Sequence, residues 1–306
     1  MQEITESQKN TWILASLAAP AAHVAAGMSW VNVLWVSLLA YGLRGLAGKG
    51  KKKTWEKWIC TAVCILAAGR ALTLMGSCWP KQKDIQWVML ILLGLSGLLA
   101  AKGKESAVQG AILLWWLTAF LLGSVLLSSV PEIGIKNLTN YYDRDNTVKL
   151  LTILLLPSLA ERERKTGGVS LVAMPLAFSI CVQGVLSGAV AAESRAPFYE
   201  LSRSIRLYGV MDRMEALAWL GLMLGTFLYL SFLLVTAGEA ADGQRGKRFL
   251  IGAAVLIGAT LGNLDLERGD WSLGVVVILA GILLPAGRKE AEKIKERNMK
   301  KMKENG

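Results

Sequence analysis

The chain is poor in the residues that most often build metal centres and hydrolytic sites. Its 306 residues include one histidine and four cysteines. Cys60 and Cys64 are four residues apart in an apolar stretch that holds no histidine or carboxylate, a pattern typical of small packing residues. No Walker sequence, nucleophile elbow or His/Cys metal cluster occurs in the sequence. We therefore expect a protein that is not an enzyme and that needs no metal and no cofactor.

Charged residues are also scarce, at 19%, and no Gly/Ser-rich linker divides the chain. Hydrophobic residues make up 53% and the mean hydropathy is +0.43, values that exclude a soluble globular domain and a disordered chain. The N-terminal segment MQEITESQKN is polar and does not resemble a cleavable signal peptide. The composition predicts one integral membrane domain over residues 1–306, with a basic tail at 288–306.

Ten apolar stretches are candidates for membrane spans. The sixth, which contains Pro157, is the shortest. As a helix it reaches only about 16 Å, roughly half of a hydrocarbon core. Discontinuous helices form the binding sites of many secondary transporters, so this stretch marks a candidate functional region. The predicted stretches are Thr11–Met28, Ser29–Leu43, Trp58–Met75, Ile85–Ala101, Ala107–Val130, Leu150–Ala160, Val169–Ala192, Ala216–Gly238, Phe249–Leu264 and Trp271–Ala286.

The positive charges alternate along the chain from loop to loop. With the N-terminus placed inside, roughly two thirds of the Lys and Arg residues fall in inner loops and the tail, as the positive-inside rule requires. This alternation predicts an even number of spans and two cytoplasmic termini, so the sixth stretch has to cross. The basic tail is expected to be a solvated end attracted to anionic lipid, with specific partner binding as the alternative.

Five stretches precede Pro131 and five follow it, which suggests an inverted five-plus-five arrangement. In such a fold the first helix of each half is broken. The sixth stretch is short, and the first carries Pro20 among small residues halfway through the span. Proline removes a backbone donor, so we expect a break that leaves carbonyls free for a ligand. The alternative for Pro20 is an ordinary kink.

The segment before the eighth stretch is amphipathic. Phe198, Leu201, Ile205 and Tyr208 fall on one helical face, with Arg203 and Arg206 turned away, as in a short interfacial helix. The segment begins at Pro197 and continues through Gly209, Arg213 and Glu215 to Trp219.

Together with two other places, this segment resembles the B subunit of nutrient germinant receptors, the GerAB-type spore germination proteins. The other two are Ile4-Thr5-Glu6-Ser7-Gln8 and the stretch from Pro131 through Gly134-Ile135-Lys136 to Leu156-Pro157-Ser158-Leu159. The chain departs from the family at Ala19–His23, where members usually carry Gly, Thr or Ser. It departs again at Val148 and Lys149, where members often carry a carboxylate.

The resemblance implies the amino acid–polyamine–organocation transporter superfamily. The expected fold is an all-α membrane bundle of ten helices, leucine-transporter-like, with the first and sixth helices broken. The expected function is a membrane subunit that binds a small nutrient, an amino acid, at midplane between those helices and triggers germination in the spore inner membrane. The family's partners are an A-type membrane subunit and a C-type lipoprotein.

Two other classes of function remain open from the sequence. One is a proton-coupled amino-acid permease, in which His23 is the candidate coupling group. The other is a structural scaffold with a vestigial pocket. The candidate ligand-binding residues are Ala19, Pro20, Ala21, Ala22, His23, Arg70, Tyr141 and Tyr142.

Each candidate also has a structural interpretation. His23 is a binding or proton-relay group, or else a neutral side chain bonded to a neighbouring helix. Arg70 is a carboxylate anchor, or else a side chain that snorkels to the surface. Arg213 and Glu215 are two residues apart and do not face each other on a helix, so each is expected to pair elsewhere and to fix the helix entry.

The start of the sixth helix has its own expectation. Tyr141 and Tyr142 precede it as interfacial aromatics, and Asp145 or Asn146 is expected to cap its N-terminus. If that end points into the bundle, the helix dipole favours an anionic group such as a carboxylate.

Overall fold

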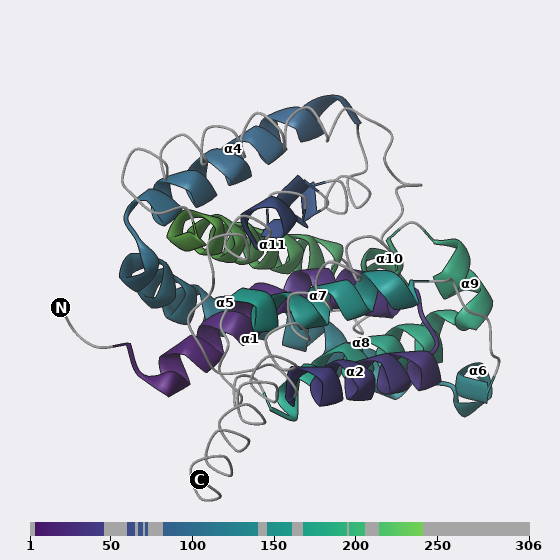
Figure 1. The fold of residues 1–306 in the computed structure, drawn as a ribbon. Coiled ribbons are helices and arrows are strands. Elements are labelled where there is room, and N and C mark those ends of the chain that lie inside the picture. The colour runs from purple at the N-terminus through teal and green to yellow at the C-terminus, as the bar shows by residue number, and fades with distance from the viewer. Residues whose placement is uncertain are drawn as a thin grey trace, which may run out of the picture.

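The computed structural model describes residues 4–45, 60–64, 67–69, 71–72, 82–139, 146–160, 168–194, 196–205 and 214–240. This part of the chain is helical and contains no strand (Figure 1). The long helices are α1 (Glu6–Ala26), α2 (Trp30–Gly45), α4 (Gln82–Ala101), α5 (Lys104–Ser129), α7 (Thr147–Ala160), α8 (Ser170–Leu186) and α11 (Met214–Ala240). The short ones are η1 (Val130–Glu132), α6 (Ile135–Thr139), α9 (Gly188–Glu193) and α10 (Pro197–Ser204).

Helix α1 begins at a capping box and runs unbroken through Pro20. The Thr5 hydroxyl accepts a hydrogen bond from the Gln8 N–H at 3.3 Å, and the Gln8 side chain accepts one from the Thr5 N–H at 2.9 Å. The predicted break at Pro20 is therefore wrong. Proline removes only one backbone donor, and the surrounding turns are rich in alanine, the strongest helix former.

Helices α1 and α11 cross closely at the centre of the bundle. A Cβ added to Gly225 of α11 would lie 2.5 Å from the Ala19 Cβ and 3.2 Å from the Ala19 backbone nitrogen. Helix α1 also contacts α5, α7, α8 and α10. The small residues of α1 thus let a central helix approach several neighbours at once, which is the usual role of small residues in packed helix pairs.

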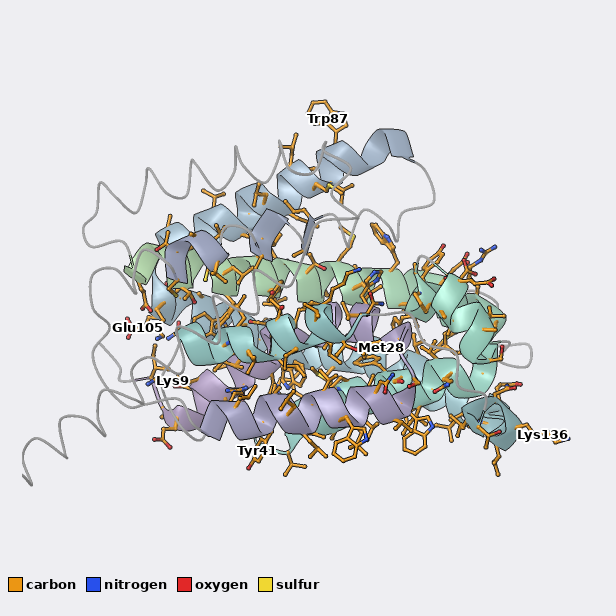
Figure 2. The ribbon with its side chains drawn as sticks, turned by 45° about the vertical axis from the view of Figure 1, so that its right-hand side comes forward. Lys9, Met28, Tyr41, Trp87, Glu105 and Lys136 are labelled. Carbon is orange, nitrogen blue, oxygen red and sulfur yellow. The ribbon has the colours of Figure 1, made fainter. Side chains whose placement is uncertain are left out.

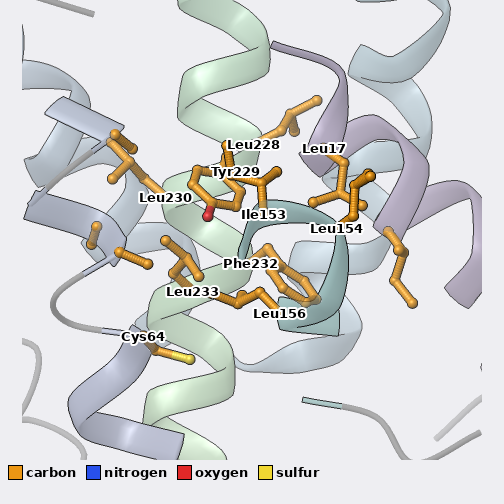
Figure 3. Close-up of a cluster of buried hydrophobic side chains, with 14 of the residues drawn as sticks. Leu17, Cys64, Ile153, Leu154, Leu156, Leu228, Tyr229, Leu230, Phe232 and Leu233 are labelled. Atoms are coloured by element: carbon orange, nitrogen blue, oxygen red, sulfur yellow. The ribbon is translucent and has the colours of Figure 1, made fainter. Parts of the chain in front are cut away.

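Helix α7 is short and lies in the interior of the bundle. It contacts α1 and α2, and every residue from Leu150 to Pro157 is buried. Figure 3 shows its Ile153, Leu154 and Leu156 gathered with Phe232 of α11 in one apolar cluster. The helix predicted over Leu150–Ala160 is confirmed, and it begins three residues earlier, at Thr147.

Helix α8 ends at Leu186, and a separate helix α9 follows it. Ser187 between them has φ 68°, in the left-handed region that L side chains rarely adopt, which stops α8 and turns the chain. The prediction of one continuous stretch over Val169–Ala192 is therefore wrong. The periodic apolar pattern continues across the turn because α9 also buries apolar residues, Ala191 and Ala192.

The predicted amphipathic helix is present as α10, which ends at Ser204. Phe198, Leu201 and Ile205 are buried, and Arg203 is exposed, as the amphipathic pattern requires. Pro197 occupies the first turn of α10, where its missing N–H costs nothing. Arg206 and Tyr208 lie outside the described residues.

Large apolar side chains cover the outer faces of α2, α4 and α5. Trp116 is 74% exposed and Phe120 69%. Among the described residues, two helical segments are long and apolar enough to cross a membrane by length and composition, Lys104–Glu132 and Met214–Glu239. The first is mostly exposed on the bundle surface and the second is mostly buried within it.

Charged residues lie at the two ends of the bundle. Figure 2 shows Lys9 and Glu105 at one end and Lys136 at the opposite end. At the first end, Lys104 lies 3.6 Å from the Glu239 carboxylate, and its Nζ lies over the Trp12 ring at 5.7 Å from the ring centroid. The ends of α1, α5 and α11 thus lie together as the charge alternation predicts for these three helices.

Several predicted segments cannot be compared with the structure. The stretch Trp58–Met75 is described only in part, and its described residues are helical. The stretches Phe249–Leu264 and Trp271–Ala286 and the basic tail lie outside the described residues. Cys60 and Cys64 are buried, as expected of packing residues.

Candidate ligand-binding site

The predicted residues Ala19 to Ala22 lie in a buried part of α1. Ala19, Pro20, Ala21 and Ala22 are all buried, and Ala19 touches the backbone of α11 at Gly225. At this level of the bundle, the small side chain of Ala19 lets α1 and α11 pack closely.

His23 is partly buried on α1, four residues before Gly27. Residues four apart on a helix lie on the same face, so His23 lies one turn below Gly27 on that face. Arg70, Tyr141, Tyr142 and Arg213 lie outside the described residues, and the structure does not place them.

The end of α1 meets the start of α7 at Gly27. A Cβ added to Gly27 would lie 3.4 Å from the Asn146 Nδ2, 3.6 Å from the Pro197 Cγ and 3.8 Å from the Ala191 carbonyl oxygen. The C-terminal turn of α1 is thus adjacent to the first residues of α7 and of α10, and to α9. The residue that precedes α7, Asn146, therefore lies against the end of α1.

Asn146 occupies the N-cap position of α7. Its carbonyl accepts the first intrahelical hydrogen bond, from the Leu150 N–H at 3.0 Å, and the residue is only 8% exposed. Of the two candidate caps, Asn146 is therefore the residue at the helix start, and Asp145 lies outside the described residues.

A polar junction ties the turn between α1 and α2 to α8. The buried Gln183 side chain accepts a hydrogen bond from the Trp30 N–H at 3.1 Å. The Ser179 hydroxyl donates to the Met28 carbonyl at 2.7 Å, and the Trp30 indole donates to the Leu138 carbonyl at 3.1 Å. Sequence reasoning missed this junction, although a lone Gln inside an apolar stretch was a usable signal, since buried polar groups need partners.

The end of α8 also holds the segment before α7. The Gly184 carbonyl accepts hydrogen bonds from the Gly134 N–H at 2.9 Å and from the Asn137 side chain at 2.8 Å. A Cβ on Gly184 would lie 2.8 Å from the Ile133 Cγ2, so the close approach requires glycine at this position. The consecutive residues Gln183 and Gly184 thus hold two separate segments, the start of α2 at Trp30 and the segment from Gly134 to Asn137.

Replacing Gln183 by leucine should lower the free energy of unfolding by about 1–3 kcal/mol, because the Trp30 N–H then loses its acceptor in a buried position. The measurement is the thermal unfolding of the purified chain. The matched control is Gln109→Leu on the exposed face of α5, with an expected change within about 0.5 kcal/mol. Equal effects of the two substitutions would contradict the role of Gln183.

Helix α10 is held by one aromatic contact and one ion pair, and it contains Pro197, which with Glu215 carries part of the family resemblance. Phe198 stacks edge-on against Phe178 of α8 with ring centroids 5.2 Å apart. The Arg203 guanidinium lies 3.6 Å from Glu215 at the start of α11. The prediction that Glu215 pairs with a residue other than Arg213 is confirmed. This pair is largely exposed, so it orients α10 and adds little stability.

Within the described residues, no group of three or more His, Cys, Asp or Glu side chains could hold a metal ion. No protein-family model and no curated protein sequence matches this chain.

Proposed function

We propose that this chain is a nutrient-sensing membrane subunit of the germinant-receptor type, which binds a small amino acid between α1 and α7. The observation that carries the proposal is the placement of α7. It is too short to cross a bilayer, it is buried from Leu150 to Pro157, and it begins beside the last turn of α1. Such half-length helices form ligand sites in many membrane proteins that bind and move small molecules.

The exposed apolar faces support a location in the membrane. Leu113, Trp116 and Phe120 of α5 are each more than two-thirds exposed, and in Figure 2 Trp87 of α4 points away from the bundle. A surface of this kind is unfavourable in water and suits lipid acyl chains. The chain would then be an integral membrane protein with both termini in the cytoplasm, in the inner membrane of a spore.

The complete fold would have ten spans in two inverted halves of five. In the proposed assembly an A-type membrane subunit and a C-type lipoprotein receive the signal. Ligand binding would shift the bundle between conformations and so trigger germination.

The test begins with the purified full chain in detergent and the twenty amino acids as probes. At least one is expected to raise the melting temperature, because a ligand that binds only the folded state stabilises it. No shift with any amino acid would favour the scaffold class. Sustained uptake of the labelled amino acid by proteoliposomes, increased by a pH gradient, would favour the proton-coupled permease instead.

His23→Ala should weaken binding of that amino acid at least tenfold while the unliganded melting temperature stays close to that of the parent. The reason is its position one turn from the meeting point of α1 and α7, where its ring can bond a ligand carboxylate. Ser7→Ala, at an exposed position of the same helix, is the control and should leave affinity unchanged. Unaltered affinity in His23→Ala would remove His23 from the site.

A further inference from the structure

One aromatic side chain joins an ion pair to the interior at the end of the bundle where α1 and α5 begin and α11 ends. The Lys104 ammonium lies 3.6 Å from the Glu239 carboxylate and 5.7 Å from the centroid of the Trp12 ring. The Lys104 side chain is 23% exposed and that of Glu239 is 46% exposed, so dissolved ions reach this pair and screen it. Trp12 is only 1% exposed. Its ring therefore touches both the charged end of the bundle and the core.

The contacts of Trp12 continue from this ion pair to α7. Its ring packs edge-on against Phe232 of α11, with ring centroids 5.0 Å apart. Phe232 lies in the same apolar cluster as Leu154 and Leu156 of α7 (Figure 3). A continuous series of contacts thus runs from the exposed ion pair to the helix of the proposed ligand site. Packed series of this kind carry coupling between distant sites when one member has two arrangements.

The indole N–H of Trp12 is the weak point of this series. It is buried and makes no hydrogen bond in the part of the chain that the structure describes. A buried donor without an acceptor raises the free energy of the conformation that contains it. Contacts of the ring hold the indole in this position, and the cation–π interaction with Lys104 is one of them. Loss of that interaction favours any other indole position in which the N–H is hydrogen-bonded.

We propose that Trp12 is a two-position element that couples the Lys104–Glu239 pair to α7. With the pair intact, Lys104 keeps the indole against Phe232, and α7 keeps its packing. When the Lys104 charge is screened or engaged by an anion, the indole leaves this position and the packing of Phe232 against α7 loosens. The proposal rests on the proposed function in one respect, because it makes this charged end a regulatory site for ligand binding between α1 and α7.

The first test needs no ligand and measures hydrogen exchange of the α7 amides by mass spectrometry, on the purified full chain in neutral detergent. Lys104→Met removes the charge at nearly constant side-chain length and should speed exchange in α7 by roughly threefold. Lys104→Arg keeps a cation at this position and should exchange like the parent. Lys102→Met is the matched control, because it removes an exposed lysine just before α5 and should leave α7 unchanged.

Trp12→Phe separates coupling from a general loss of stability. Phenylalanine keeps an aromatic ring for Phe232 and Lys104 but has no N–H, so the drive to leave this position is gone. In the Trp12→Phe background, Lys104→Met should therefore have little effect on exchange in α7. An equal effect of Lys104→Met with and without Trp12→Phe would overturn the proposal, and so would unchanged exchange in Lys104→Met alone.

The second test uses the twenty amino acids as probes and reads affinity from the concentration dependence of the melting temperature. An amino acid that binds the parent should bind Lys104→Met with roughly threefold lower affinity, since fewer molecules then hold α7 in the binding-competent packing. Sodium chloride at about 0.5 M should weaken binding to the parent more than binding to Lys104→Met. Equal affinity in the two proteins would overturn the regulatory role and leave the proposed function standing. If exchange in α7 responds as expected and no amino acid binds, the coupling stands and nutrient sensing is wrong.

Discussion

Replacing Gly225 by leucine should lower the free energy of unfolding by roughly 3 kcal/mol, because even its Cβ would overlap Ala19 at the crossing of α1 and α11. The atoms that the new Cβ would meet are the Cβ and the backbone of Ala19, and these cannot move aside by a change of side-chain rotamer. The expected result is a lower melting temperature of the purified chain, with loss of the folded protein as the extreme case.

Gly123→Leu on α5 is the matched control for this substitution. No atom lies within 4 Å of a Cβ at Gly123, so the added side chain meets open surface and stability should change little. A further test is the exchange of the two residues. Gly225→Ala should destabilise the chain, and adding Ala19→Gly should restore part of the loss by removing the methyl group that it meets. Independent effects of these two substitutions would contradict the close crossing.

Replacing Phe232 by alanine should cost about 3–5 kcal/mol, the range for removing a fully buried aromatic side chain from a packed core. Phe232 is 0% exposed and packs edge-on against Trp12 of α1, with ring centroids 5.0 Å apart. It also belongs to the apolar cluster that α7 enters (Figure 3). Its loss would leave a cavity where α1, α7 and α11 share one core, measurable as a lower melting temperature.

Phe120→Ala is the control for the loss of Phe232. The two residues are chemically identical, but Phe120 is 69% exposed on α5, so truncation there leaves no cavity. The expected change is below about 1 kcal/mol. Equal destabilisation by both substitutions would contradict the placement of Phe232 in the interior and of Phe120 on the surface.

Helix positions were largely predictable from the sequence, because apolar runs and capping residues act locally. The capping pattern at Thr5 and Gln8 and the amphipathic face of α10 needed no knowledge of distant residues. The short α7 was equally visible as a limited apolar stretch. Where two local signals conflicted, the prediction failed. Pro20 suggested a break, but the alanine-rich turns and the packing around them keep α1 continuous.

The candidate site was predictable only in outline. The sequence indicated the first and sixth helices, and it offered Asn146 as one of two possible caps. It gave no reason to select Gly27, since a glycine that faces an amide more than a hundred residues away has no local signature. Gly184 was missed for the same reason, because its partners are Gly134 and Asn137. Gln183 had a local signal as a lone polar residue in an apolar stretch, but that signal did not identify its partner Trp30.

The sequence by itself determined that this chain is apolar and helical, with a short sixth helix and one amphipathic helix before the eighth stretch. These properties follow from composition and from periodicity over a few turns. Only the tertiary structure decided that Gly225 and not Gly123 needs to be glycine, that Ser187 ends α8, and that Asn146 lies against α1. Each of these depends on which distant segments come into contact, and contact distances are set by packing of the whole bundle.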